Sequence, residues 1–156
     1  MNPHATRRSC GFTLVELMVA VVVAGILAAV AYPAFTSMVA RGRRADAIAA
    51  LTSVMQAQER YRSNRTLYAS SFGSEGLGME ATLAAAHKYY EVTMEGLGEP
   101  AYSTGYVLTA TPRTNSPQAY DKDCQVLKLK LDGSVYSYAS ENLAGDDTTA
   151  QNCWRH

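Results

Sequence analysis

The hydrophobic pattern of this chain changes abruptly near its amino end. Residues 17–35 (LMVAVVVAGILAAVAYPAF) form a run of 19 residues without a charged side chain. Because roughly 20 helical residues cross the hydrocarbon core of a bilayer, this run is long enough to span a membrane. It is apolar on every face, which argues against a helix in the core of a small soluble domain. The pattern therefore favours a membrane helix.

The pattern becomes one-sided after Phe35 and stays compatible with a helix to about Tyr61. At 100° per residue, one face of this stretch is apolar and the opposite face is polar. We therefore expect one long helix, with an apolar half at residues 12–35 and an amphipathic half at residues 36–62. The face that needs a cover carries Ala47, Ile48, Leu51, Val54, Met55, Gln58 and Tyr61.

Residues 63–156 have the pattern of a small α+β head domain. Residues 63–80 are rich in Ser, Gly and Asn and are typical of a loop, after which a short helical turn is expected at 79–87. In the last β-rich runs, Leu127, Leu129 and Leu131 alternate with polar residues, and Asp132-Gly133 is a hairpin signal. The predicted fold class is α+β, a long amino-terminal helix packed on an antiparallel sheet of three or four strands. The expected strands are 89–94, 106–111, 125–131 and 134–139.

The length and the net charge of the chain exclude some classes of protein. The chain has 156 residues, and its 14 basic residues balance 14 acidic ones. This length fits one domain with an appendage. Zero net charge argues against a protein that coats nucleic acid along its length, which would be strongly basic.

A cleaved secretory signal is the main competitor of a membrane helix. Arg7 and Arg8 supply a basic start, and residues 29–31 fit a small-residue cleavage site that would leave Tyr32 as the first residue. Glu16 argues against this alternative, since an ordinary signal peptide gains nothing from a carboxylate at the mouth of its apolar stretch. A carboxylate at the edge of a membrane segment is costly and is a candidate functional group.

The stretch GFTLVELM at residues 11–18 resembles the processing signature of type IV pilins and the related pseudopilins. It follows a short basic leader at residues 1–11 and precedes the apolar run. The resemblance implies that a prepilin peptidase cuts after Gly11 and that Phe12 becomes the N-methylated amino terminus. It also implies that Glu16 faces the Phe12 amino group of a neighbouring subunit in a filament. Pro33 falls where the family often has a helix-bending proline.

The resemblance also accounts for the odd number of cysteines. Removal of the leader would take Cys10 with it and leave Cys124 and Cys153. In a head that lies outside the cytoplasm a disulfide between such a pair would persist. The segment from Cys124 to Cys153 resembles the disulfide-bounded carboxy-terminal loop of type IVa pilins.

The function implied by the resemblance is that of a structural subunit of a type IV pilus. Residues 34–63 lack the second helix proline of many major pilins, which favours a minor pilin over a major one. The stretch QERY at residues 58–61, Tyr68 and Cys153-Trp154 resemble type IVa minor pilins of the PilE type. Such a subunit would prime or join a filament used for twitching motility, adhesion or DNA uptake. It would sit in the bacterial inner membrane by a single pass before assembly and in an extracellular pilus afterwards. The implied partners are other pilin subunits, the prepilin peptidase, the inner membrane, and DNA or a host surface.

Two alternatives in the same setting stay open. A type II secretion pseudopilin shares the amino-terminal signature. A pilus-borne DNA receptor would use basic residues of the head as phosphate contacts. The candidates for those contacts are Arg113, Lys122, Lys128 and Lys130.

The sequence gives no support for an enzyme, a cofactor or a metal centre. His4, His87 and His156 are far apart along the chain, so no histidine-based catalytic or metal-binding group is predicted. No phosphate-binding glycine loop occurs either. We expect no catalytic residue, no cofactor and no metal.

Overall fold

The computed structural model describes residues 12–84, 86–121 and 124–154, and it divides into two compact units with a boundary between Met38 and Val39. One helix, α1 (Leu14–Arg62), contributes to both units. The leader and Lys122 lie outside the described residues.

The first unit contains the apolar part of α1. All side chains from Phe12 to Met38 are exposed, including Leu17, Ile26 and Leu27. By length and composition, α1 is a helix that could cross a membrane, and within the described residues it is the one helix that meets this test. Nothing in the described part of the chain covers this apolar surface.

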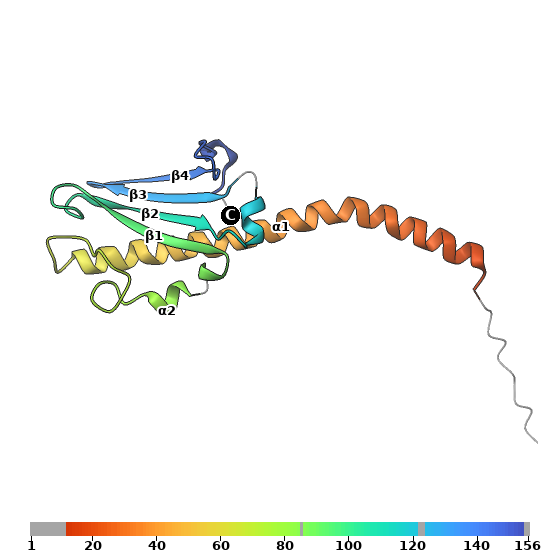
Figure 1. The fold of residues 1–156 in the computed structure, drawn as a ribbon, viewed down its shortest axis with the longest axis horizontal. Coiled ribbons are helices and arrows are strands. Elements are labelled where there is room, and N and C mark those ends of the chain that lie inside the picture. Colours follow the sequence, from red (N-terminus) through yellow and green to blue (C-terminus); the bar gives the residue numbers. More distant parts are fainter. Residues whose placement is uncertain (1–11, 85, 122–123, 155–156) are drawn as a thin grey trace, which may run out of the picture. The chain divides into compact units, whose positions relative to one another are not determined.

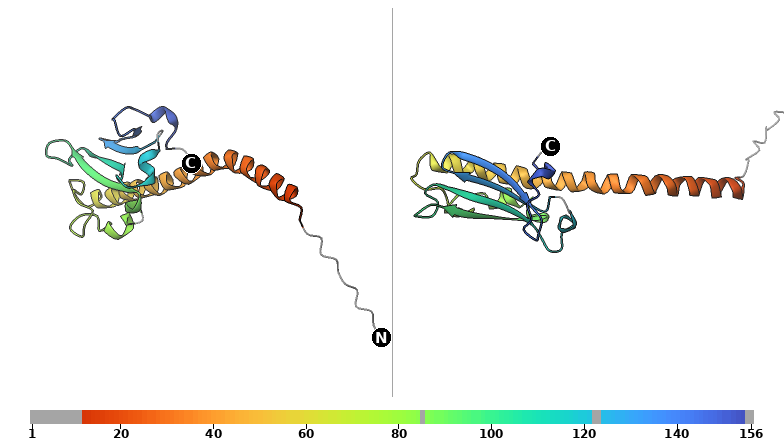
Figure 2. Two further views of the ribbon diagram at one scale, coloured as in Figure 1. Left: turned by 45° about the vertical axis from the view of Figure 1, so that its right-hand side comes forward. Right: turned by 90° about the horizontal axis from the view of Figure 1, so that it is seen from above.

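The second unit is an α+β head built on a four-stranded antiparallel sheet in the order β1-β2-β3-β4. The sheet lies along the second half of α1 (Figures 1 and 2). This arrangement confirms the predicted fold class, and the sheet has the larger of the two expected numbers of strands. The strands are β1 (Tyr90–Leu97), β2 (Gly105–Pro112), β3 (Val126–Asp132) and β4 (Val135–Glu141). The short helices are α2 (Glu80–Leu83), η1 (Ala86–Lys88), η2 (Pro117–Tyr120) and η3 (Thr149–Gln151).

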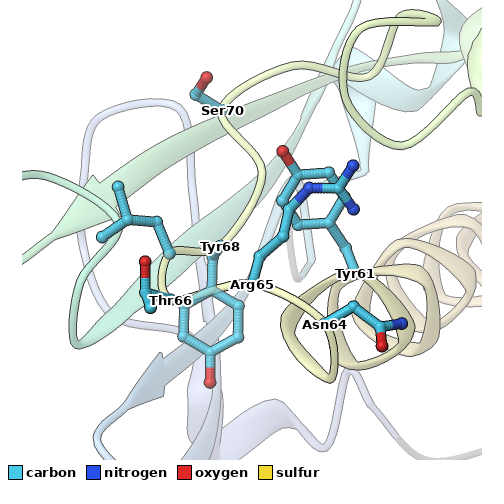
Figure 3. A pocket seen from close by; sticks show the side chains of 7 residues that line it. Tyr61, Asn64, Arg65, Thr66, Tyr68 and Ser70 are labelled. Carbon is cyan, nitrogen blue, oxygen red and sulfur yellow. The ribbon is translucent and has the colours of Figure 1, made fainter.

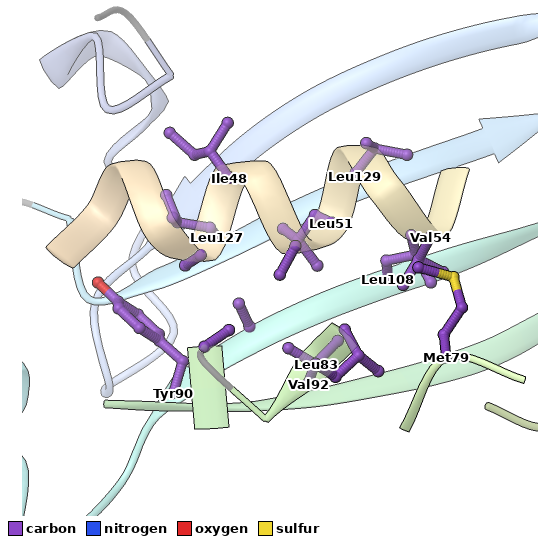
Figure 4. Packing of buried hydrophobic residues seen from close by; sticks show 14 of the residues in the cluster. Ile48, Leu51, Val54, Met79, Leu83, Tyr90, Val92, Leu108, Leu127 and Leu129 are labelled. Carbon is purple, nitrogen blue, oxygen red and sulfur yellow. The ribbon is translucent and has the colours of Figure 1, made fainter. Parts of the chain in front are cut away.

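Alternation along the strands places one face of the sheet against α1. Leu127, Leu129 and Leu131 are buried, as their spacing predicts, while Lys128 and Lys130 lie on the other face. The helix contributes the matching apolar stripe of Ala47, Ile48, Leu51 and Val54 (Figure 4). Removal of these side chains from water drives the packing of the head. Strands β1 and β2 add Tyr90, Val92, Tyr106, Leu108 and Ala110 to the same core.

The β3–β4 connection is a two-residue turn in which glycine is required. Asp132 pairs with Val135, so Gly133 and Ser134 are the central residues. Gly133 has a φ of 63°, a left-handed conformation that side chains with a Cβ rarely adopt. The hairpin signal in the sequence therefore marks the correct turn.

One buried glutamine fastens the loop that follows α1. The Gln58 side chain donates a hydrogen bond to the Ala69 carbonyl and accepts one from the Ala69 amide, both at 2.8 Å. Gln58 is fully buried, so a polar side chain on the apolar stripe has both of its amide atoms satisfied. These two hydrogen bonds, which we call the Gln58 clasp, fix the loop between α1 and α2.

Candidate functional site

The amino-terminal segment exposes the residues that the processing signature assigns to assembly. Phe12 precedes α1 and is 82% exposed. The Glu16 amide donates to Thr13 Oγ1 at 3.2 Å, which satisfies one free N–H group in the first turn and leaves the Glu16 carboxylate exposed. Gly11 lies outside the described residues. This geometry leaves Phe12 and Glu16 available to a second subunit.

Pro33 sits inside α1 without ending it. A proline lacks the N–H group that would bond one turn back, and its ring bends a helix. The Thr36 hydroxyl donates to the Pro33 carbonyl at 2.9 Å, and Ser37 donates to Ala34 at the same distance. These two side chains add hydrogen bonds to carbonyl groups in the turn that begins at the proline.

Cys124 and Cys153 form a disulfide with a Cα–Cα distance of 5.6 Å and a sequence separation of 29 residues. The pairing therefore confirms the disulfide that the resemblance implies. Both cysteines are buried, and the next residue, Trp154, donates its indole N–H to the Ala139 carbonyl at 2.8 Å. The bridge and this bond hold the carboxy-terminal loop against β4.

A buried ion pair joins α1 to the segment before the first of these cysteines. Arg44 Nε lies 2.9 Å from Asp121 Oδ2, and their side chains are 14% and 6% exposed. Gln118 Nε2 donates to the same carboxylate oxygen at 2.6 Å, and Arg44 Nη1 lies 2.8 Å from Cys124 Sγ. Burial, followed by the charge of Asp121, raises the pKa of Tyr90 above its usual range. Because its charge is paired inside the head, Arg44 is a structural residue rather than an open binding group.

The predicted phosphate contacts of the sheet are already paired with acidic groups. Lys128 Nζ lies 2.6 Å from Glu141 Oε1, and Lys130 Nζ lies 2.9 Å from Asp132 Oδ2. Arg113 is exposed just beyond the end of β2. The outer face of the sheet thus brings Lys128 and Lys130 together but balances both charges.

Two more carboxylates border that face. Glu91 and Glu95 are exposed on β1, and their register places them opposite Thr111 and Val107 of β2. In the β2–β3 register Lys130 lies opposite the same Val107, so Glu95 and Lys130 occupy the same row of the sheet. A phosphate backbone that approached this face would meet more acidic than basic groups.

A second basic cluster, which the sequence analysis did not single out, lies where α1 ends. Arg60, Arg62 and Arg65, which we call the arginine cap, fall within six residues of sequence. None of the three lies within ion-pair distance of a carboxylate in the described part of the chain. The signal was present as the segment ERYRSNR, in which arginine recurs around a tyrosine.

Aromatic rings hold the arginine cap in place. The Arg65 guanidinium carbon lies 4.0 Å from the centre of the Tyr61 ring, and that of Arg62 lies 5.4 Å from the centre of the Tyr68 ring. Arg62 Nη1 also donates to the Arg65 carbonyl at 2.6 Å. Contacts of a cation with an aromatic face orient the guanidinium without neutralising its charge. Arg62 and Arg65 are therefore held in place and still positively charged.

An open hollow of about 490 Å³ borders the arginine cap (Figure 3). It is lined by polar groups that can donate or accept hydrogen bonds, together with the two tyrosines and one leucine. At the edge of this hollow, Arg65 lies across the Tyr61 ring (Figure 3). The lining residues are Tyr61, Asn64, Arg65, Thr66, Leu67, Tyr68 and Ser70.

Comparison with known families matches this chain in two stretches. Residues 6–32 match the prokaryotic N-terminal methylation motif. Residues 33–128, which are more than half of the chain, match the family described as type IV minor pilin ComP, DNA uptake sequence receptor. The chain belongs to the type IV pilin family.

Curated relatives agree with this family. The type IV major pilin protein PilE of Neisseria gonorrhoeae is 32% identical over 147 residues, which cover 88% of this chain and 80% of that protein. The fimbrial protein of Neisseria meningitidis is 28% identical over 144 residues, covering 91% of this chain and 79% of that protein. The type IV major pilin protein PilA of Myxococcus xanthus is 41% identical over 68 residues, covering 44% of this chain and 30% of that protein. No solved structure matches the chain.

Membership of the family fixes the general role of this pilin. It is a structural subunit of a type IV pilus, and the family model matched by residues 33–128 places it among the minor pilins. Its partners include other pilin subunits, and its methylation motif is that of a substrate of the prepilin peptidase. The apolar first half of α1 fits a subunit that is held in a membrane before it enters the filament.

Proposed function

We propose that this minor pilin carries a double-stranded DNA-binding surface on its head and presents it on the pilus. The match of residues 33–128 to a family described as a DNA uptake sequence receptor carries the proposal. The arginine cap supplies a surface with the required chemistry, because it holds three guanidinium groups without a described carboxylate partner. Arginine binds phosphate oxygens through two parallel N–H groups, which suits it to a nucleic-acid backbone.

The arginine cap is a better candidate than the lysines of β3. A phosphate that binds Lys128 or Lys130 must displace the carboxylate of Glu141 or Asp132. Phosphates that bind the cap displace only water and counterions, and the release of DNA counterions drives such binding. Arg113 is a weaker candidate because its hollow of about 410 Å³ also contains Glu91.

Salt dependence of DNA binding separates the two surfaces. We would measure the affinity of the full-length pilin in detergent for a labelled duplex across a range of salt concentrations. The double variant Arg60→Ala/Arg65→Ala is expected to reduce the slope of log K against log salt by about 0.9 for each phosphate contact removed. Arg62 is left intact because it bonds the loop backbone.

Lys128→Ala/Lys130→Ala is the matched control, since it removes two positive charges from the outer face of the sheet. It should leave the salt slope unchanged if the arginine cap binds the DNA. A lower slope in the lysine variant, with the arginine variant unaffected, would move the site to the sheet. Binding of no duplex by the unaltered pilin would refute the receptor role itself.

We further propose that maturation follows the pattern of the amino-terminal signature. The prepilin peptidase cuts after Gly11, Phe12 becomes the N-methylated amino terminus, and Glu16 pairs with that terminus on a neighbouring subunit. The mature head then lies outside the cytoplasm, on a single-pass membrane protein before assembly and on the pilus afterwards. The first residue and mass of the mature protein test this, because a start at Tyr32 would indicate a cleaved secretory signal.

A gene deletion tests the pilus role against a secretion role. Loss of pili, or of DNA uptake with pili intact, is expected for this minor pilin. A defect confined to protein secretion would instead assign it to a type II secretion system.

A further inference from the structure

Three positive charges surround α1 just beyond its apolar half. Arg41 and Arg43 follow Phe35 by six and eight residues, and at 1.5 Å per residue the first of these steps is a rise of about 9 Å. The two arginines are two positions apart, so they leave the helix about 200° from each other. The third charge, Lys88, comes from η1. We call Arg41, Arg43 and Lys88, together with Tyr89, the basic collar.

The ring of Tyr89 brings two of these charges together. The Arg43 guanidinium carbon lies 4.8 Å from the centre of the ring, and the Lys88 ammonium nitrogen lies 5.3 Å from it. The neighbouring Lys88, and after it Arg43, lower the pKa of Tyr89. Two like charges beside one aromatic ring create a local positive field.

No described acidic group neutralises this field. The carboxylates that form ion pairs in the described residues belong to Asp121, Glu141 and Asp132, and their partners are not members of the collar. Asp46 is exposed one turn further along α1 without an ion pair to Arg43. The collar therefore keeps the capacity to bind an external anion.

We propose that the basic collar binds the phosphates of anionic phospholipids while the pilin is held in the membrane. The headgroup layer of a bilayer lies within several ångströms of its hydrocarbon core, which is where residues that soon follow an apolar span are found. Arginine and lysine reach toward this layer with flexible stems, and tyrosine is enriched in it. The collar combines these residue types from α1, from η1 and from Tyr89, which lies between η1 and β1.

The position of the collar favours lipid over DNA. Its residues lie in or beside the sequence that leaves the apolar span, whereas the arginine cap lies at the other end of the amphipathic half of α1. An acidic face on a neighbouring subunit is the competing anion, because it would offer carboxylates in place of phosphates. Binding to lipid phosphates depends on the lipid composition, whereas binding to carboxylates of a neighbouring subunit does not. A test can use that difference.

Hydrogen exchange of the full-length pilin in lipid nanodiscs tests the proposal. We would compare amide exchange in residues 86–90 between nanodiscs of phosphatidylglycerol and nanodiscs of phosphatidylcholine. Exchange is expected to be at least about fivefold slower with the anionic lipid, since a single basic side chain near an anionic surface contributes an effect of that order. Added salt should remove the difference, because screening weakens exposed charge interactions.

Charge reversal supplies the variant and its control. Arg43→Glu/Lys88→Glu should exchange at the same rate in both lipids. Lys128→Glu/Lys130→Glu has the same change of charge on the sheet and should keep the lipid dependence of the unaltered pilin. If the collar variant also exchanges faster in β3, its head is destabilised as a whole. Arg43→Gln/Lys88→Gln then takes its place, because it removes charge without introducing repulsion.

Three outcomes would overturn the proposal. Equal exchange of residues 86–90 in both lipids would show that the collar has no preference for anionic phospholipids. Retention of lipid dependence in the collar variant assigns the effect to other residues. Protection that is absent in nanodiscs of both lipids and appears only in assembled filaments assigns the collar to a neighbouring subunit.

Discussion

The two halves of α1 share one secondary structure and differ in what covers them. From Leu14 to Met38 every side chain is exposed, although the segment is almost wholly apolar. From Val39 to Arg62 the helix buries one stripe, in which Leu51 and Val54 are fully inaccessible. Backbone hydrogen bonds form within either half, so helix formation itself does not require a cover. What differs is whether the chain provides one.

This difference shows which half depends on other molecules. The amphipathic half finds its apolar partner in the sheet of the same chain (Figure 4). The first half is apolar around its whole circumference, and an exposed surface of that kind needs lipid or another protein. We propose that this pilin meets both needs one after the other, with lipid before assembly and neighbouring subunits afterwards. The second half is a folding element, and the first is an assembly element.

Glu16→Ala should give the largest effect, because it removes the charged group of the uncovered half. We propose that Glu16 compensates the amino terminus of a neighbouring Phe12 in an apolar filament core, where an unpaired charge is strongly disfavoured. We expect the variant to remain in the membrane with a normally folded head and to be lost from purified filaments. Immunoblots of membrane and filament fractions measure both.

Asp46→Ala is the control for that experiment, since it removes an exposed acidic side chain from the covered half of the same helix. Its incorporation should equal that of the unaltered pilin. Normal incorporation of Glu16→Ala would show that the assembly element does not use this charge.

A matched pair of leucines separates folding from assembly. Leu51 is fully buried in the head, whereas Leu27 in the first half is 65% exposed. Leu51→Ala should lower the free energy of unfolding of the head by about 2–5 kcal/mol, since it leaves a cavity in the core. Leu27→Ala should change that energy by less than about 0.5 kcal/mol. Denaturant unfolding in detergent, followed by Trp154 fluorescence, checks both values.

Much of this contrast can be predicted from the sequence because it rests on local pattern. Nineteen uncharged residues indicate the first half, and the spacing of Ala47, Leu51 and Val54 indicates the buried face of the second. The alternation of Leu127 with Lys128 likewise indicates which side of β3 faces the helix. In each of these cases the sequence of a single element is enough to predict which of its side chains are exposed.

The arginine cap and the pairing of the lysines could not be predicted in the same way. Whether Lys128 is a free cation depends on Glu141, which is 13 residues away and which the β3–β4 register places opposite Val126, diagonally across from Lys128. The orientation of Arg62 depends on Tyr68 in the loop that Gln58 fastens. Such contacts join residues through the tertiary fold, so sequence spacing alone does not reveal them.

Gln58→Met tests how the covered half holds the loop that carries part of the arginine cap. The substitution keeps an unbranched side chain of similar length but removes both hydrogen bonds to Ala69. Because the Ala69 amide and carbonyl would be left buried without these partners, the head should lose about 2 kcal/mol of unfolding free energy. Gln56→Met changes an exposed position one half-turn away and should have little effect. Equal loss in both variants would show that the clasp does not stabilise the head.

The smallest expected effect concerns the contact between the end of α1 and β4. The Tyr136 hydroxyl donates to Glu59, and Tyr136→Phe should therefore lower the unfolding free energy by about 1 kcal/mol near pH 8. Burial, followed by that hydrogen bond, raises the pKa of Tyr136 to about 12. A raised pKa in the folded state means that the stabilisation is complete below about pH 10, the value for an exposed tyrosine, and declines as the pH approaches 12.

The pH dependence distinguishes this contact from a simple loss of packing. As the pH rises from about 10, the unaltered pilin should lose stability faster than Tyr136→Phe, so the difference between them shrinks. Burial, followed by its contact with Tyr136, also raises the pKa of Tyr106, so part of the pH dependence that Tyr136→Phe removes belongs to Tyr106. Leu51→Ala is the control for a pure loss of packing, because its loss of unfolding free energy should not vary with pH over this range. A difference between Tyr136→Phe and the unaltered pilin that stays constant from pH 8 to pH 11 would show that the hydroxyl does not titrate in contact with α1.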